Sequence, residues 1–467
     1  MTTRTPPRGI PTDAAATAPA LGPRTWAAII LIGLVGQLAW VIENMYLNLF
    51  VYETVSTDPG VIAWMVAASA IAATVATLIV GAWSDRLGRR RELVAGGYLA
   101  WGAVTAAFGL VGAPDAAAEA APVLIGAVVA IIALDCVMSF IGSGANDAAF
   151  AAWVTDSTVP ANRGRVDGWL ATMPLVAMLL VFVLLDPMTQ AGQWPAFFAL
   201  VGGVTAVTGV VAWFLVRDRG VAPREQHVLR AVVEGLRPAT VRREPALFLT
   251  LAIWCVIGIS SQVFIPFVLI YLRYSLALEA SAIALGIVLV LASALSVVGG
   301  RVMDRVGKER FLLPAVGVFV AGLVAMTFVR DFAWVIVAAT FMMAGMMASI
   351  AAVSAMTRDQ TPADRAGGVQ GARMIMAVML PMVIGPAIGA AVISGAAHSY
   401  VELGREHPVP GPEIFPVAAL VLVAVPVLAA LRTRVLRRAA APDPAGADTG
   451  AGAGADAGAD AAEETRA

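Results

Sequence analysis

The sequence GAWSDRLGRRR occupies residues 81–91 and returns in altered form as GRVMDRVGKER at residues 300–310. Each copy follows a long apolar run and places glycine, aspartate, arginine, glycine and a basic residue at the same spacing. These shared positions are Gly81, Asp85, Arg86, Gly88 and Arg89 in the first copy and Gly300, Asp304, Arg305, Gly307 and Lys308 in the second. A second loop is repeated as well, with DSTVPANRG at 156–164 and DQTPADRA at 359–366. Two loops duplicated in the same order predict two homologous halves.

The composition places most of the chain in a membrane. Hydrophobic residues make up 59% of the 467 residues, charged residues only 13%, and the mean hydropathy is +0.82. Soluble domains carry about 25% charged residues. Runs of about 20 apolar residues, the length that crosses a bilayer as a helix, predict twelve transmembrane helices. They start near Trp26, Val61, Leu93, Pro122, Gly168, Trp194, Ala246, Ala280, Phe311, Phe332, Gly367 and Ile414.

The basic residues predict which side each loop faces. With the N-terminus in the cytoplasm, every lysine and arginine falls on the cytoplasmic side except Arg273, Arg330 and Arg405. Cytoplasmic loops of membrane proteins carry such an excess of positive charge. We therefore expect both termini in the cytoplasm and a location in the plasma (inner) membrane, surrounded by lipid.

The remaining segments divide the chain into five parts. We expect a disordered cytoplasmic N-terminus at 1–24, a six-helix half at 25–216, a cytoplasmic central loop at 217–245 and a second six-helix half at 246–432. Residues 433–467 contain mostly small and acidic residues, which cannot bury enough apolar surface to fold, so a disordered tail is predicted.

The loop at 81–91 resembles the signature loop between the second and third helices of the major facilitator superfamily, and the resemblance extends from about Trp26 to Leu431. It implies an all-α membrane fold of two pseudo-symmetric six-helix halves that rock to give alternating access. It also implies that Asp85 faces the start of the eleventh helix and that an arginine of the motif pairs with Asp147 or Asp156. With Arg163 and Arg365 of the second repeated loop, these residues form the expected gating set. The alternative is that the arginines only set the topology.

Two acidic residues lie inside predicted membrane helices, where ionisable groups are costly and mark functional sites. Glu43 lies about 25 Å along the first helix, at the edge of a face formed by Gln37, Trp40, Asn44 and Asn48. Asp135 lies near the middle of the fourth helix, on a face with Ser139 and Asn146. We expect these residues to bind the solute or a coupling cation, a proton or sodium. The alternative is that they only join helices by hydrogen bonds.

The second half offers Trp254 and Gln262 of the seventh helix as the best matching solute contacts. Because no titratable residue lies inside the seventh to tenth or the twelfth predicted helix, we expect ion coupling in the first half and a mainly apolar wall opposite.

The sequence therefore predicts a secondary transporter that moves a small organic solute by cation-coupled symport, and we expect it to be a monomer. A sugar-like solute suits the polar face. The alternative is drug export by proton antiport: the Gly-Pro-x-x-Gly element of exporters is missing from the fifth helix, although Gly385 to Gly389 reads GPAIG in the eleventh. A second alternative is a membrane sensor or lipid-handling protein. No enzymatic constellation, metal-ligand spacing or cofactor motif is found, and a net charge of −1 does not favour nucleic acid as a partner.

Overall fold

The computed structural model describes residues 21–111, 121–218, 238–278, 281–361, 366–396, 398–402 and 405–440. Residues 1–20 of the expected disordered N-terminus, most of the central loop and residues 441–467 of the expected tail lie outside these ranges. Residues 23–24 and 433–440, for which the sequence predicts disorder, are helical, because they continue the first and last helices of the bundle. Within them, twelve helical spans are long and apolar enough to cross a membrane. In order they are Pro23–Thr54, Pro59–Leu87, Arg90–Leu110, Ile125–Ser157, Asn162–Gln190, Trp194–Leu215, Pro245–Ser275, Ser281–Val306, Lys308–Phe328, Phe332–Gln360, Val369–Ala396 and Ile414–Arg438, here numbered spans 1 to 12. The predicted multi-pass fold is confirmed.

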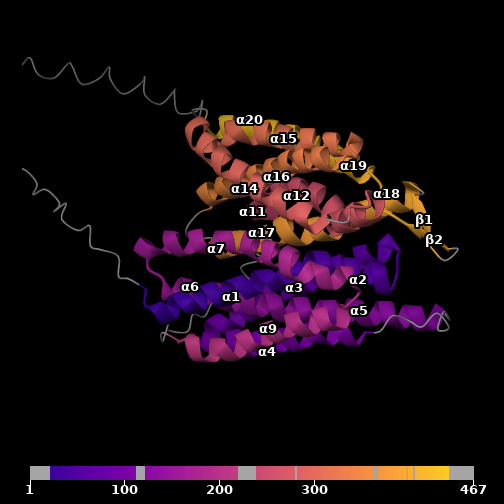
Figure 1. Cartoon of the computed structure of the whole chain (residues 1–467). Coiled ribbons are helices and arrows are strands. Elements are labelled where there is room, and N and C mark those ends of the chain that lie inside the picture. The colour runs from indigo at the N-terminus through magenta and orange to yellow at the C-terminus, as the bar shows by residue number, and fades with distance from the viewer. Residues whose placement is uncertain are drawn as a thin grey trace, which may run out of the picture.

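Spans 1 to 6 form the lower half of the molecule in Figure 1. Their helices are α1 (Pro23–Val41), α2 (Leu47–Thr54), α3 (Pro59–Leu87), α4 (Arg90–Ala107), α5 (Ala121–Gly142), α6 (Ala151–Ser157), α7 (Pro160–Leu180), α8 (Asp186–Gln190) and α9 (Trp194–Leu215). In the fifth span, helix α7 begins at Pro160, earlier than the apolar run near Gly168. Proline suits the first position of a helix, and the polar turn that follows it is also helical.

Spans 7 to 12 form the upper half, preceded by the short α11 (Pro238–Arg243). Their helices are α12 (Pro245–Phe264), α13 (Val268–Ile270), α14 (Ser281–Val306), α15 (Lys308–Phe328), α16 (Phe332–Gln360), α17 (Ala366–Met374), α18 (Leu380–Ala396), α19 (Ile414–Val421) and α20 (Ala424–Ala440). Between spans 11 and 12, β1 (Ser399–Glu402) and β2 (Arg405–Pro408) pair antiparallel as a hairpin. We call the side of the bundle with this hairpin the hairpin end, and the side where α1 begins and α20 ends the terminal end (Figure 1).

The repeated loop has the same backbone feature in both halves. Gly88 ends α3 with φ of 61°, and Gly307 precedes α15 with φ of 91°. This region of conformational space suits glycine, because other residues would place a Cβ against the backbone. The loop glycine that the repeat shares is therefore needed for the turn between spans 2 and 3 and between spans 8 and 9.

Turns of π-helix interrupt spans 1, 4, 5, 7 and 11. They lie at Ile42–Tyr46, Ser143–Phe150, Val181–Leu185, Tyr271–Ser275 and Ile375–Met379. Such wide turns occur mostly as single bulges inside α-helices, frequently at functional sites. Four of the polar residues named in the sequence analysis, Glu43, Asn44, Asn146 and Asp147, lie within them.

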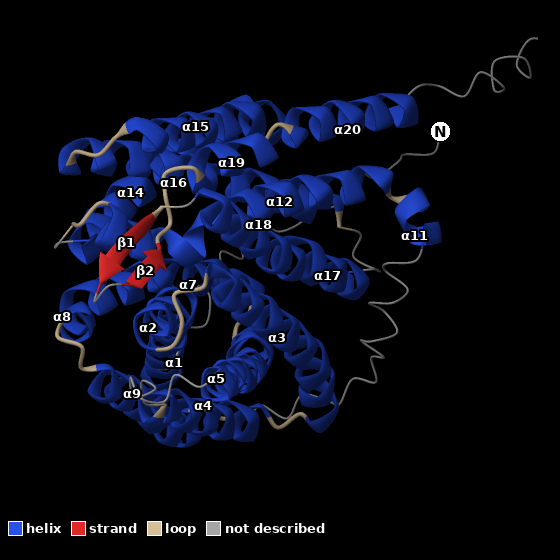
Figure 2. Ribbon diagram, turned by 90° about the vertical axis from the view of Figure 1, so that its right-hand side faces the viewer, coloured by secondary structure: helices blue, strands red, loops and turns tan. Residues whose placement is uncertain are grey.

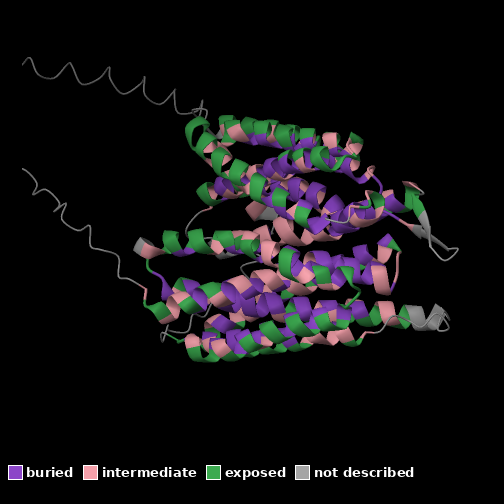
Figure 3. Cartoon of the chain, in the orientation of Figure 1, coloured by how far each residue is buried: buried purple, intermediate pink, exposed green. Residues whose placement is uncertain are grey.

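Helix packing is closest where glycines allow backbones to approach. A Cβ at Gly102 of α4 would collide with Ala206 and the Gly202 carbonyl of α9, and a Cβ at Gly345 of α16 would collide with Phe319 of α15. Between the halves, α3 packs along α18, and α14 packs against α7 and the π turn after it (Figure 2). Buried residues face the inside of the bundle, and exposed residues such as Trp64, Phe214 and Val207 face outward (Figure 3). An apolar outer surface is what lipid requires.

Candidate functional site

Glu43 lies in the π turn of span 1, with 8% of its surface exposed. The hydroxyl of Ser139, on α5, donates a hydrogen bond to its Oε1. Its second oxygen, Oε2, is buried without a hydrogen-bond partner. The structure thus brings together two predicted site residues from spans 1 and 4, and leaves one carboxylate oxygen that lacks a donor.

Asp135 lies one helical turn before Ser139 on α5 and is 1% exposed. Ser69 of α3 lies close enough to its carboxyl group to interact with it, and Asp135 Oδ1 is buried without a hydrogen-bond partner. Asp135 is close enough to Glu43 for the two carboxyl groups to interact electrostatically. Ser69, Asp135, Ser139 and Glu43 form one buried group, which we call the carboxyl cluster.

Asp147 lies in the π turn of span 4, and its side chain is exposed. Asn146 donates to its Oδ1 at 3.0 Å, and the Trp40 indole lies close to the same carboxyl group. Asp147 also lies close enough to Glu43 for the two carboxyl groups to interact electrostatically, so Asp147 and the carboxyl cluster are neighbours.

Tyr98 of α4 supports this arrangement from behind. Its hydroxyl lies 2.8 Å from Asn146 Oδ1 and 2.9 Å from the Ile32 carbonyl oxygen. The absence of a side chain at Gly36 makes room, because a Cβ there would collide with both the hydroxyl and Asn146. No pattern in the sequence distinguishes Tyr98, since a tyrosine in an apolar span is equally suited to packing.

The remaining polar residues of span 1 bond mainly to their own helix. The Asn44 side chain donates to the Trp40 carbonyl and the Asn48 side chain donates to the Asn44 carbonyl, each at 2.8 Å. Asn48 is buried and its Oδ1 has no partner, whereas Gln37 is half-buried. Span 1 therefore presents a further acceptor without a donor.

The second half contributes a cation. Trp254 of α12 is buried, and the guanidinium of Arg373, on α17, lies 5.7 Å from the centre of its ring. Gln262 packs at its Cβ against Gly385 of α18, which makes it part of a tight helix contact. Arg373 thus places a positive charge in the second half, near the terminal end, although the sequence predicts a mainly apolar wall there.

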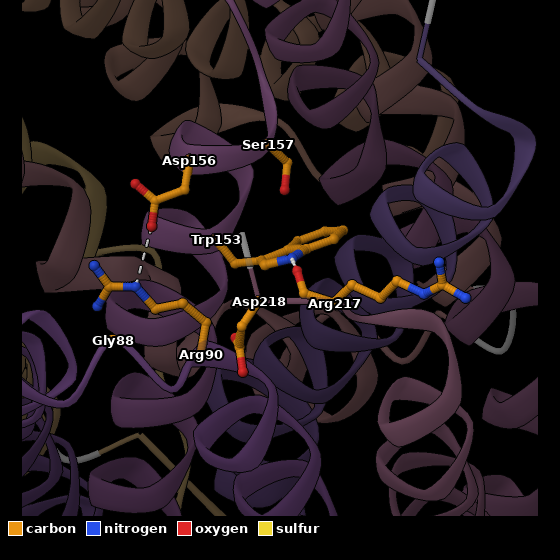
Figure 4. A pocket seen from close by; sticks show the side chains of 7 residues that line it. All are labelled: Gly88, Arg90, Trp153, Asp156, Ser157, Arg217 and Asp218. Carbon is orange, nitrogen blue, oxygen red and sulfur yellow. Dashed lines mark hydrogen bonds and ion pairs between the residues drawn. The ribbon is translucent and has the colours of Figure 1, made fainter. Parts of the chain in front are cut away.

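At the terminal end, the first repeated loop forms a buried charge group around Arg90. Its guanidinium pairs with Asp85 at 2.6 Å and with Asp156 at 3.2 Å, and it also donates to Ser84. Arg86 and Arg89, the motif arginines selected from the sequence, are exposed. Figure 4 shows Arg90 and Asp156 together in a small surface pocket with Gly88, Trp153, Ser157, Arg217 and Asp218.

The second copy of the loop is built differently. Lys308 pairs with Asp359 at 2.5 Å, while Asp304 and Arg305 are exposed. Gly81 packs near Ala148, whereas Gly300 has no neighbour within 4 Å of a Cβ placed on it. Arg163 reaches Thr158 and the Thr155 carbonyl, both at 3.4 Å, and Arg365 lies outside the described residues. Only the first copy therefore buries its charges.

The comparisons with known proteins agree with this architecture. A family model described as Major Facilitator Superfamily matches residues 26–386. The chain belongs to the Major Facilitator Superfamily. No curated protein matches the chain.

Solved structures of this superfamily match along nearly their whole length. The nucleoside transporter NupG has a TM-score of 0.63 at 13% identity, over 89% of this chain and 100% of that one. A bacterial homologue of the human lysosomal transporter Spinster, in an inward-facing state, has a TM-score of 0.65 at 15% identity, over 90% and 99%. The xylose transporter XylE from E. coli has a TM-score of 0.59 at 15% identity, over 86% and 97%. At these identities the likeness shows the superfamily fold.

Within the described residues, no group of three or more His, Cys, Asp and Glu side chains is placed to hold a metal ion. The carboxyl cluster has another character. Its unpartnered atoms are acceptors, so it is suited to a proton, a monovalent cation or a solute that brings hydrogen-bond donors.

Proposed function

We propose that this superfamily member is a secondary transporter that couples the movement of a small polar organic solute to a cation, by alternating access. The observation that carries the proposal is the carboxyl cluster, in which Glu43 Oε2 and Asp135 Oδ1 are both buried without a donor. Burying two like charges side by side is unfavourable unless a cation neutralises them. A proton or sodium shared by this pair removes the penalty, and its release restores it.

We place the solute site beside the cluster, with Trp40, Asn48 and Asp147 of the first half and Trp254 and Arg373 of the second as its candidate contacts. Amides, an indole and charges of both signs suit a hydroxylated solute. The similar structures that transport nucleosides and xylose also handle hydroxylated solutes, which supports testing these two classes first. We place the protein in the plasma membrane with its terminal end on the cytoplasmic side, since this end carries most of the arginines.

Export by antiport is the second candidate. Its sequence support, the GPAIG element at 385–389, has a structural explanation: Gly385 lies against Gln262, and Gly389 lies against the Val263 carbonyl and the Phe267 ring. These glycines let α18 approach α12 closely. The element is thus accounted for by helix packing, which weakens the case for export.

The test is solute uptake into proteoliposomes, with and without an imposed proton or sodium gradient. Glu43→Gln and Asp135→Asn should each lower gradient-driven accumulation about tenfold or more, equivalent to about 1.4 kcal/mol of lost driving force. Glu92→Gln, which changes an exposed carboxylate at the terminal end, is the matched control and should accumulate solute normally.

Normal accumulation by both cluster variants would remove the coupling role of the cluster. If inverted vesicles instead concentrate unrelated hydrophobic cations and no hydroxylated solute, the exporter is the correct assignment.

A further inference from the structure

A buried charge group at the hairpin end joins the two halves. Arg273, at the end of span 7, pairs with Glu53 of span 1 at 2.8 Å and with Asp186 of span 5 at 3.4 Å. The side chains of Arg273 and Glu53 are each 15% exposed and that of Asp186 is 2% exposed. Arg273 also donates to the Thr189 hydroxyl, and the Tyr274 hydroxyl donates to Glu53. We call these five residues the Arg273 network.

The network lies where the halves meet. The rings of Tyr52, from the first half, and Tyr274, from the second, lie 5.3 Å apart between centres. The Tyr52 hydroxyl donates to the Pro408 carbonyl at the end of β2, at 2.8 Å. Ser275, next to this stack, donates to the Pro410 carbonyl. The hairpin is therefore fastened to span 7 and, across the interface, to span 1.

The charges of the network belong to different halves. Both carboxylates are on the first half and the guanidinium is on the second. Separating the halves here would therefore take Arg273, the cation of the network, away from both carboxylates. Breaking a buried pair is strongly unfavourable, because it leaves buried charge uncompensated. The network therefore stabilises the contact between the two halves at the hairpin end, unless water or a solute solvates the charges that separation would expose.

A direct chain of contacts leads from the network to the carboxyl cluster. Asp186 Oδ1 accepts a hydrogen bond from the Tyr46 hydroxyl at 3.0 Å. Tyr46 and Glu43 occupy the same π turn, Ile42–Tyr46. Asp186 directly follows the π turn of span 5, and Arg273 lies within that of span 7. Each contact is thus attached to a helical segment whose wide turn can change its hydrogen bonding.

The geometry points to a gate at the hairpin end, formed by the Arg273 network and linked through Tyr46 to the state of Glu43. Release of Arg273 frees Asp186, changes the partner of Tyr46 and alters the π turn that holds Glu43 against Ser139. The inference deepens the proposed function, on which it rests, by naming the residues that connect closure of one end to the cation site.

The experiment measures access to Asn48, which lies buried below the gate. Cys136 and Cys255 are replaced by alanine, Asn48→Cys is introduced, and the rate of labelling by a membrane-impermeant thiol reagent is measured from the side of the hairpin end. Arg273→Gln should raise this rate about fivefold or more, whereas Arg273→Lys should stay near the parent because it keeps the charge. Arg330→Gln is the control, since Arg330 lies at the same end but is exposed and, among the described residues, donates to the nearby Val329 and Thr327 carbonyls.

The link to Glu43 is tested with the same readout. Glu43→Gln should change the labelling rate by about threefold or more, in the range of coupling through packed networks. In a Tyr46→Phe background, which lacks only the hydroxyl, that change should disappear.

An unchanged rate in Arg273→Gln, or an equal rise in Arg330→Gln, would overturn the gate. An unchanged effect of Glu43→Gln in Tyr46→Phe would overturn the link. Because labelling needs no solute, a failure of the transport proposal would appear separately, as absence of uptake with the labelling pattern intact.

Discussion

At the scale of residues, burial separates arginines that look alike in the sequence. Arg86, Arg89, Arg90 and Arg91 are consecutive members of one basic run, yet Arg90 alone contacts both Asp85 and Asp156. Arg91 instead lies 4.4 Å from the Trp213 ring, and its backbone N–H donates to Asp218. We propose that the Arg90 group stabilises the terminal end of the first half and takes the gating role that the motif resemblance implies.

Arg90→Gln should lower the stability of the protein by about 1–3 kcal/mol. The value is below that of a fully buried pair, because Asp85 and Asp156 remain partly exposed. Thermal unfolding of the purified protein in detergent measures it. Arg86→Gln, which removes an exposed charge four residues earlier, should leave the midpoint unchanged; equal losses in both variants would show that only the total charge of the loop matters.

At the scale of elements, glycines determine how closely helices approach. Gly202 and Gly203 are adjacent in α9 but face different surroundings. A Cβ at Gly202 would collide with the Gly102 carbonyl and the Ala106 backbone of α4, whereas a Cβ at Gly203 meets nothing within 4 Å. Contact between α4 and α9 therefore depends on the first glycine and is independent of the second.

Gly202→Ala should destabilise the protein by about 1–3 kcal/mol, the usual cost of adding a group to a tightly packed contact. Gly203→Ala should change stability by less than about 0.5 kcal/mol, as exposed substitutions usually do. Detergent unfolding of both variants side by side decides the matter. A larger loss from Gly203→Ala would mean that its surface contacts another element.

At the scale of the whole molecule, the two ends differ in how they are held. Polar contacts between the halves within the described residues include Arg273 with Glu53 and Asp186, and Tyr52 with Pro408, all at the hairpin end. The charge group at the terminal end, around Arg90, lies inside the first half. Asp147 is exposed while Asp135 is buried. Among the described residues, these ion pairs and hydrogen bonds join the two halves at the hairpin end.

The orientation predicted from the arginines can be measured on intact cells. In a background without Cys136 and Cys255, Ser399→Cys on the exposed hairpin should react with an impermeant thiol reagent. Leu87→Cys, exposed at the terminal end, should react only after the membrane is opened. The reverse pattern would place the termini outside the cytoplasm.

The sequence by itself determined the twelve spans, their two-half organisation and the superfamily. These rest on local properties: an apolar run of sufficient length must be a helix in lipid, since every backbone polar group has to be satisfied internally. The cost of intramembrane charge also directed attention to Glu43 and Asp135 before any contact was known.

Only the tertiary structure decided which of these side chains meet. Ser69 of span 2 lies beside Asp135 of span 4, and Ser139 of span 4 donates to Glu43 of span 1. Arg90 is buried, whereas Arg86 and Arg89 of the same basic run are exposed. The Arg273 network draws on spans 1, 5 and 7, and its members appeared in the sequence as unrelated charges near helix ends. Such groupings depend on how helices rotate and where π turns shift their faces, and neither follows from the apolar pattern of a single helix.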